Sequence, residues 1–236
     1  MGGAPQEIQA QGYAYARSGE SAELALPVCA DGYKPEAALL VCAPAYRLNE
    51  SILEKHLPDL REMAARLSYR LGAQVYAPFQ SQDQPPVETT AALTEAEMRR
   101  FLAGPWAARL ACLRPDGAPH VVPVWQEWDG KAFYVVAWQG SRWGEYLRQN
   151  PRLSLTVDEP WPPLRRVSAQ GNAEALDQDG LPDSLDRLPA LEKLLDRLSR
   201  RYLGEPLQPG LRQRTGTIFR IQPDWMRGWK GLQAAG

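Results

Sequence analysis

The stretch 110–157 constrains the fold of this chain more than any other part of its sequence. It contains three runs typical of strands, LACL, APHVVPVWQEW and KAFYVVAW, separated by PDG at 115–117 and DG at 129–130. The DG pair favours a two-residue hairpin. Ser141 can then cap a short helix, which the Asn-Pro pair at 150–151 ends before a further strand. We therefore predict an antiparallel meander with a helix attached to it.

Composition excludes several classes of protein. The 236 residues carry a formal net charge of −1, which argues against a nucleic-acid binder that acts through bulk charge. No apolar run is long enough to cross a membrane and the N-terminus lacks the apolar core of a signal peptide, so we expect a cytoplasmic protein. We also expect no metal site, because Cys29, Cys42 and Cys112 lack metal-binding spacing and the histidines are only His56 and His120.

The segment 77–92 separates two predicted domains. Most of it, PFQSQDQPPVETTAA, is polar, contains prolines and shows no apolar period, as is typical of a linker. Directly afterwards, Thr94 and Glu97 have the spacing of a capping box, which predicts the start of a helix and of a folding unit. We expect a first domain over 1–76 and a second over 93–236.

The first domain is expected to contain strands at 11–15, 22–29 and 37–43, followed by a helix with leucines and alanines at three- and four-residue spacing. Its sequences GYAYARSGESAELALPV, AALLVCAPAYRL and LPDLREMAARLSYRLGA resemble the C-terminal half of the effector-binding domain of IclR-type transcriptional regulators. The resemblance covers about residues 6–76 and implies a partial, GAF-like α/β segment. The DNA-binding part of such regulators has no counterpart here, so no DNA binding is expected. The segment is either a structural or dimerisation module or an effector pocket.

The second domain resembles a different family. From Leu93 onward, the succession LTEAEM, ARLACLRPDGAPHVVPVW, SRW, LRQNPRLSL, RRVSAQGNAE, RYLG and IFRIQP is similar to the pyridoxamine 5′-phosphate oxidase-like superfamily. The resemblance covers nearly all of 93–233. It implies an antiparallel FMN-binding split β-barrel with flanking helices, so that the whole chain is of the α+β class. It also implies FMN as the cofactor, with the deazaflavin F420 as the alternative, bound between the protomers of a homodimer.

The same resemblance assigns candidate cofactor-binding residues. The segment 122–125 matches a strand that lies along the flavin ring, and Pro123 predicts an edge or a bulge there because it cannot donate to a ladder. Ser141 and Arg142 match the phosphate-binding S-R-K segment, and a hydroxyl, a guanidinium and free amides at a helix start suit a phosphate. Trp143 replaces the usual Lys, so it either removes a cation or stacks against the cofactor. The full predicted set is Val122, Pro123, Val124, Trp125, Trp138, Ser141, Arg142, Trp143, Arg166, Gln170 and Trp229.

Arg166 and Gln170 belong to this set for a separate reason. They lie on a strand with small residues, which suits either contacts across a dimer interface or tight barrel packing. Trp138 and Trp229 are the tryptophans that we expect nearest to a cofactor.

Flavin chemistry needs no catalytic triad, because the ring itself carries the hydride, and the sequence identifies no catalytic residue. True pyridoxamine-phosphate oxidases carry RxVLLK where this chain has VxVWQE at 122–127, which argues against vitamin B6 oxidation. We predict a flavin-dependent oxidoreductase acting on a small molecule. The alternatives are a non-catalytic flavin or small-ligand sensor and, ranked lower, haem binding through His56 or His120.

Overall fold

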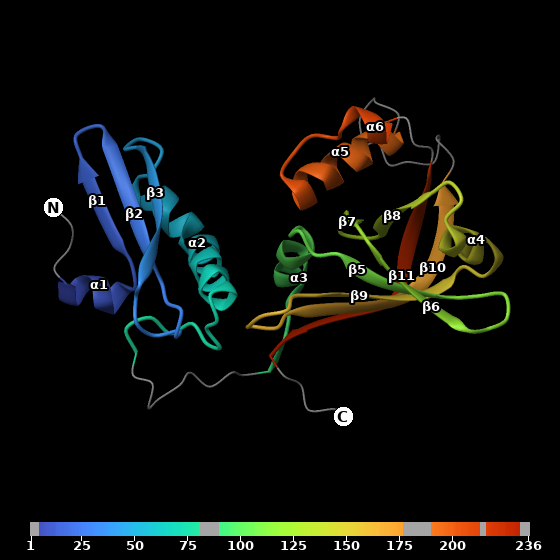
Figure 1. Cartoon of the computed structure of the whole chain (residues 1–236), viewed down its shortest axis with the longest axis horizontal. Helices are drawn as coiled ribbons and strands as arrows, with labels where there is room; N and C mark the ends of the chain where they lie inside the picture. Colours follow the sequence, from blue (N-terminus) through green and yellow to red (C-terminus); the bar gives the residue numbers. More distant parts are fainter. Residues whose placement is uncertain (1–4, 81–89, 177–189, 213–215, 232–236) are drawn as a thin grey trace. The chain divides into compact units, whose positions relative to one another are not determined.

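The computed structural model describes residues 5–80, 90–176, 190–212 and 216–231. The chain divides into two compact units, Met1–Glu88 and Thr89–Gly236 (Figure 1). Each unit has a buried hydrophobic cluster made of its own residues.

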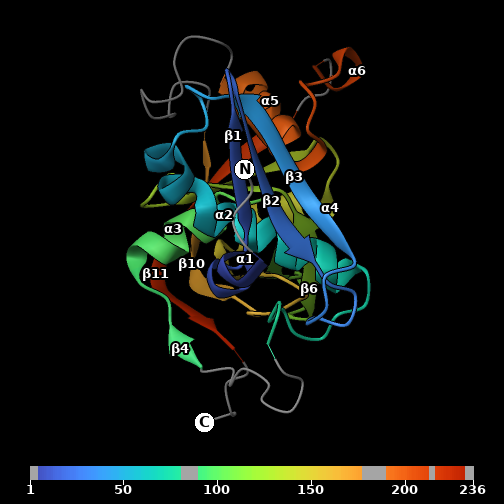
Figure 2. The same cartoon turned by 90° about the vertical axis from the view of Figure 1, so that its left-hand side faces the viewer.

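The first unit is a three-stranded antiparallel sheet with one long helix behind it (Figure 2). Its elements are α1 (Pro5–Gln11), β1 (Ala14–Ser18), β2 (Ser21–Val28), β3 (Ala37–Pro44) and α2 (Glu50–Arg70), with the strands in the order β1-β2-β3. Alternate residues of β2 point towards α2, so that Ala22, Leu24 and Leu26 are fully buried. Asn49 caps α2 by accepting a hydrogen bond from the Ile52 N–H at 3.0 Å. Whether this unit is related to an effector domain stays a prediction.

The expected start of the first strand is wrong by three residues. Helix α1 occupies Pro5–Gln11, and Gly12 follows it with a φ of 73°, a conformation that glycine adopts without steric strain. The chain therefore turns at Gly12 before β1 begins. Pro58 lies inside α2, which runs unbroken from Glu50 to Arg70.

The second unit is an antiparallel sheet that curves into a half-barrel with flanking helices (Figure 1). The strands of its 8-stranded sheet follow the order β6-β5-β9-β10-β11-β8-β7, and the short β4 pairs with β11. Its elements are β4 (Ala91–Ala92), α3 (Glu95–Leu102), β5 (Ala108–Leu113), β6 (Pro119–Val124), β7 (Gln126–Trp128), β8 (Phe133–Trp138), α4 (Arg142–Gln149), β9 (Arg152–Asp158), β10 (Arg166–Leu176), α5 (Ala190–Leu203), α6 (Pro209–Arg212) and β11 (Gly216–Lys230).

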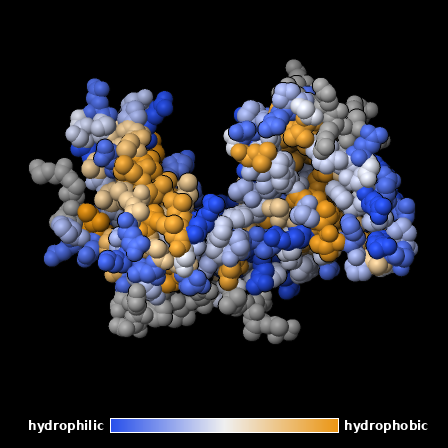
Figure 3. All heavy atoms as spheres, viewed as in Figure 1, coloured by the Kyte–Doolittle hydropathy of each residue, from blue (hydrophilic) through white to orange (hydrophobic). Residues whose placement is uncertain are grey.

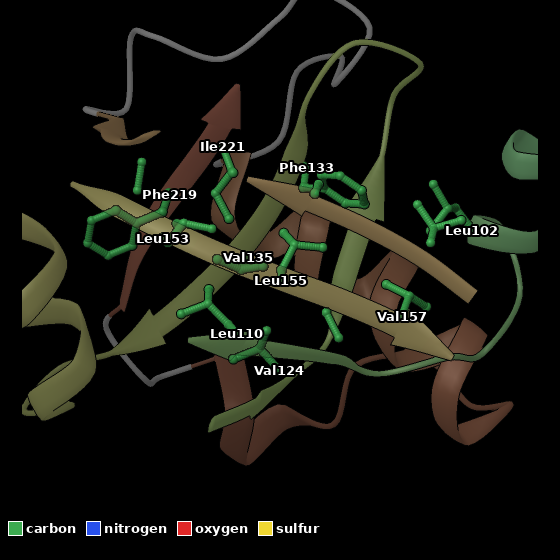
Figure 4. Packing of buried hydrophobic residues seen from close by; sticks show 14 of the residues in the cluster. Leu102, Leu110, Val124, Phe133, Val135, Leu153, Leu155, Val157, Phe219 and Ile221 are labelled. Atoms are coloured by element: carbon green, nitrogen blue, oxygen red, sulfur yellow. The ribbon is translucent and has the colours of Figure 1, made fainter. Parts of the chain in front are cut away.

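One face of this sheet forms the core. Leu110, Leu155 and Val157 from neighbouring strands are almost completely buried, and Phe133 and Phe219 join them from the other side of the half-barrel (Figure 4). Because strand residues alternate between faces, the residues between these buried positions lie on the outer face of the sheet.

Local signals set the start of α3. The Glu97 N–H donates to the Thr94 hydroxyl at 3.2 Å, and the Thr94 N–H donates to the Glu97 carboxylate at 2.8 Å. The predicted capping box is thereby confirmed.

Helix α5 is anchored on β7 by polar groups at its C-terminal end. The Tyr202 hydroxyl donates to the Trp106 carbonyl at 2.7 Å, and Arg201 pairs with the buried Glu127 at 2.5 Å. Burial raises the pKa of Tyr202, which keeps its hydroxyl protonated as a donor. The RYLG segment therefore holds a helix against the barrel.

The hairpin expected at Asp129-Gly130 has a longer loop than the predicted two residues. Residues 129–132 separate β7 from β8. The Asp129 carboxylate accepts hydrogen bonds from the N–H groups of Lys131 and Ala132 at 2.7 and 2.8 Å. This side chain stabilises a wider turn, a common use of Asp.

The expected linker 77–92 extends into 81–89. The leucines at 188, 191, 195 and 198 also predict a helix over 185–203. Residues 81–89 and 185–189 lie outside the described residues. Within the described part of the chain, no helix combines the length and the apolar character needed to span a bilayer.

Candidate functional site

Strand register gathers four of the predicted residues on the outer face of the half-barrel. Side chains that are directly opposite each other form rows across β6, β5, β9, β10 and β11. One row contains Val121, Ala111, Ser154, Gln170 and Trp225, the next contains Pro123, Arg109, Thr156, Ser168 and Arg227, and a third contains Asp158, Arg166 and Trp229. We call these three rows the outer platform.

Arg166 and Trp229 form a directly opposed pair at one end of the outer platform. The guanidinium of Arg166 lies 4.9 Å from the centre of the Trp229 ring, and one of its nitrogens donates to the Gly231 carbonyl at 3.4 Å. Within the described part of the chain, Arg166 Nε and Trp229 Nε1 are buried without a hydrogen-bond partner. Buried donors of this kind are uncommon, although Trp161 Nε1 and Arg220 Nε are in the same situation. What distinguishes Arg166 and Trp229 is that they lie side by side on the outer platform, where a ligand can offer acceptors to both.

Among the described residues, strand β6 offers a free edge beside this platform. It stands at the end of the strand order, with β5 on its other side. Pro123 lies opposite Arg109 and has no hydrogen to donate, so these two form a non-hydrogen-bonded pair of the ladder. Val121 has the same orientation as Pro123 and directs its N–H and carbonyl to the open edge. A planar ligand can bond there in place of a strand.

The start of α4 carries a second group of predicted residues. Ser141 is the N-cap residue, yet its side chain makes no capping hydrogen bond, and the first amides of a helix have no partner within it. Arg142 is exposed and has no ion-pair partner among the described residues. Trp138 and Ser141 line a cavity of about 320 Å³ together with Thr217. Arg142 is not among the residues that line this cavity, and the charged residues that line it, Glu145 and Arg148, pair with each other at 2.7 Å. The helix start itself suits an anionic ligand, because the Ser141 hydroxyl, the first amides and the Arg142 side chain all belong to it.

Other predicted residues are engaged in packing. Trp143 is 8% exposed and packs against Phe219, with 6.1 Å between the ring centres. Trp125 stacks on Tyr202 of α5 at 5.0 Å with the planes nearly parallel. Val122 and Val124 face inward, opposite the buried residues of β5, and Val124 is itself buried. These contacts hold both tryptophan rings without any ligand.

The two groups lie on opposite sides of one sheet. Helix α4 contributes Trp143 and Leu147 to the core, so it packs against the inner side of the half-barrel. The outer platform faces the other way. The start of α4 and the donor-bearing outer platform of one chain therefore do not face each other.

Polar residues that the sequence did not single out lie between the predicted ones on the outer platform. The hydroxyls of Thr156 and Ser168 lie 3.1 Å apart, and Arg109 pairs with Asp158 at 2.7 Å. Their signal is the alternation of polar and apolar residues in RLSLTV and RVSAQ, which marks an outer strand face. No such pattern predicts Thr217, which lines the cavity at α4 although it lies far from α4 in the sequence.

The second unit is similar to a known protein family and to several solved structures. The family described as pyridoxamine 5′-phosphate oxidase matches residues 94–230. A FAD-binding protein from Mesorhizobium loti is 27% identical, with a TM-score of 0.45 over 61% of this chain and 99% of that one. A conserved hypothetical protein from Mycobacterium tuberculosis is 23% identical, with a TM-score of 0.48 over 61% and 93%. An F420 reductase is 24% identical, with a TM-score of 0.44 over 54% and 94%. No curated protein sequence matches this chain.

Proposed function

Since this chain belongs to the pyridoxamine 5′-phosphate oxidase family, we propose that its second unit binds a flavin and acts as an oxidoreductase on a small molecule. FMN is the proposed cofactor and F420 the alternative. A bound flavin supplies the hydride-transfer chemistry, while the protein holds and orients it. The residues fit such a group, because its phosphate needs cations and amides and its ring needs hydrogen-bond donors.

The observation that carries this proposal is the Arg166–Trp229 pair. Its Nε and Nε1 groups are buried donors without partners in the described structure. Carbonyl and ring-nitrogen acceptors of a flavin satisfy such donors, and the Trp229 ring supplies an aromatic contact. At the start of α4, Ser141 and Arg142 are the proposed phosphate ligands.

We also propose that the site is shared between two copies of the chain. The groups at α4 and on the outer platform face opposite ways, so one cofactor takes one group from each chain. Two large apolar side chains of the outer platform are also exposed to solvent, Val121 at 60% and Trp225 at 41%. A second half-barrel packed on this face would cover them.

Vitamin B6 oxidation is not part of the proposal. True oxidases carry RxVLLK at the positions that correspond to 122–127. In this chain the last of these positions is Glu127 in place of the Lys. Glu127 is buried and pairs with Arg201 and Arg197, so its charge is used within the fold. No cation projects from this position towards a substrate.

Titration with FMN and, separately, with F420 tests the cofactor. We expect a shift in the flavin absorption spectrum and a raised melting temperature with one of them, because a ligand that binds only the folded state stabilises it. A protein that shows neither change with either compound contradicts flavin binding. A flavin that binds but cannot be reduced and reoxidised on the protein points to the sensor alternative.

Mixing two variants tests the shared site. Arg142→Ala and Trp229→Leu each damage both sites of a homodimer, but a mixed dimer has one intact site and one that carries both changes. After subunit exchange at equal amounts, about a quarter of the sites should bind FMN with wild-type affinity. If mixing restores no tight sites while exchange is shown to occur, each site is built from a single chain.

A further inference from the structure

The first unit leaves one edge of its sheet open. Within the described residues, β3 pairs with β2 alone and stands last in the strand order. It is eight residues long, and no charged residue lies between Glu36 and Arg47. Proteins usually protect long edge strands with charges, bulges or a covering element, because an open edge pairs with another chain. Among the residues of β3, Pro44 at the end of the strand is the one that cannot donate a hydrogen bond to an added strand.

The hydrogen bonds to β2 identify which groups of β3 are free. The Ala45 N–H donates to the Glu20 carbonyl at 2.7 Å, directly beyond the last registered pair of the two strands. In an antiparallel ladder such bonds alternate along the strand, so the odd-numbered residues of β3 bond to β2. The N–H groups of Ala38, Leu40 and Cys42 therefore point to the open edge.

An apolar surface flanks this edge. On α2, Met63 is 50% and Leu67 is 40% exposed, and Figure 3 shows apolar surface gathered over this helix. Arg61 marks the β1 side of the helix, since its guanidinium lies 5.8 Å from the Tyr13 ring. At about 100° per residue, Leu67 lies roughly 120° around the helix from Arg61, on the flank towards β3.

The inner face of β3 lies beside this flank. Leu39 and Val41 are only half-buried because their strand has no neighbour beyond it. We call Met63, Leu67, Leu39 and Val41 the apolar notch.

We propose that β3 pairs antiparallel with β3 of a second copy, about a twofold axis at Leu40. Leu40 then lies opposite Leu40 of the second copy, and Ala38 lies opposite its Cys42. This register uses all three free N–H groups of each strand. Moving one strand by two residues in one direction sets Ala38 opposite Pro44, which has no N–H and whose carbonyl already accepts from the N–H groups of Arg47 and Leu48. Moving it by two residues in the other direction sets Cys42 opposite Glu36, whose N–H already donates to the Val28 carbonyl. The strand thus has one best register with itself.

Side chains and charges also fit a second copy. In this register Leu39 lies opposite Val41 of the second copy, and Met63 and Leu67 of both helices close over them, so the two apolar notches cover each other. Leu40, 58% exposed, gains an apolar neighbour on the outer face. Antiparallel pairing brings Glu36, before the strand, to the end where the second copy carries Arg47. Opposite charges thus flank an uncharged centre.

A disulfide in the full-length protein tests this contact. In the Ala38→Cys variant the new thiol faces the natural Cys42 of the second copy at about 5.5 Å between Cα atoms, a distance that a disulfide spans. Under mild oxidation we expect a covalent dimer on a non-reducing gel. The matched control is Ser18→Cys, an exposed position on the opposite edge strand β1. If the two β3 strands are paired, they hold the two thiols close together at an effective concentration in the millimolar range. The Ala38→Cys crosslink should therefore form about 100-fold faster than the control.

Two further variants sharpen the result. Replacing Cys42 by Ser in the Ala38→Cys protein must abolish the crosslink, which shows that it joins 38 to 42. Leu40→Lys sets two lysines opposite each other at an exposed position, so it should suppress the crosslink while the circular dichroism spectrum stays unchanged. Crosslinking no faster than that of the Ser18→Cys control would overturn the proposal. This outcome is independent of whether the second units of two copies form a dimer.

Discussion

Arginine side chains in the second unit differ in whether their guanidinium groups are already paired within the fold or remain available to a ligand. Arg165 is nearly buried and donates to the Glu159 carboxylate from its backbone N–H, Nε and a terminal nitrogen at 2.7 to 2.9 Å. Its guanidinium also lies 5.1 Å from the Phe101 ring. Arg142 is exposed at the start of α4, where the structure describes no ion pair for it. Arg165 therefore serves the fold, and Arg142 is free to hold an anion.

Replacing Arg142 by Ala should weaken FMN binding. A charge-assisted hydrogen bond contributes about 1.5–3 kcal/mol, so the dissociation constant should rise roughly 10- to 100-fold. Flavin fluorescence titration measures the change. Arg114→Ala is the control, because Arg114 is an exposed arginine that pairs with Asp116 at 3.0 Å in the β5–β6 turn. Equal affinities in both variants would remove Arg142 from the site.

Among the elements, α3 shows how a local signal acts within the tertiary structure. Its capping box joins Thr94 and Glu97, and Lys230 of β11 lies 3.4 Å from the same Glu97 carboxylate. Hydrogen bonds from the Thr94 N–H and hydroxyl lower the pKa of Glu97 below its ordinary value. The carboxylate is thus more stable as an anion in the folded than in the unfolded chain.

This shift predicts a pH dependence of stability for Glu97→Gln. A carboxyl whose pKa is lower in the folded state stabilises the fold fully above its unfolded pKa, near 4.3, and loses that contribution as the pH falls through the folded value. Urea unfolding should therefore show the wild type more stable than Glu97→Gln at pH 6, with a smaller difference at pH 3. Glu95→Gln removes a carboxylate from the same helical turn and serves as the control. A difference that stays constant with pH speaks against the capping box as its source.

For the whole molecule, two units with separate cores predict separable functions. Every residue proposed to bind flavin lies within Thr89–Gly236. A protein that begins at Thr89 should therefore fold and bind FMN with the affinity of the full chain. Circular dichroism and flavin titration of both proteins check this. A folded fragment that has lost FMN binding would show that the first unit takes part in the site.

Much of the local structure could be predicted because its causes lie within a few residues of each other. The caps at Asn49 and Thr94 are examples, since donor and acceptor are three residues apart. Alternating strands at 108–158 and the family resemblance likewise follow from short patterns, and the family is confirmed over 94–230. The start of β1 and the loop at Asp129 were mispredicted, because helix α1 and an Asp side-chain turn competed with the expected extended chain.

The site depended on contacts between distant residues. The sequence shows that Trp125, Trp143 and Trp229 are large aromatics, but not which of them packs into the fold. Pairing with Tyr202 and Phe219 engages the first two, while strand register sets Trp229 beside Arg166. The sequence by itself determined most of the strands and helices, the caps at Asn49 and Thr94, and the family. Tertiary structure alone decided which donors remain without partners, because that depends on what the rest of the chain brings within hydrogen-bonding distance.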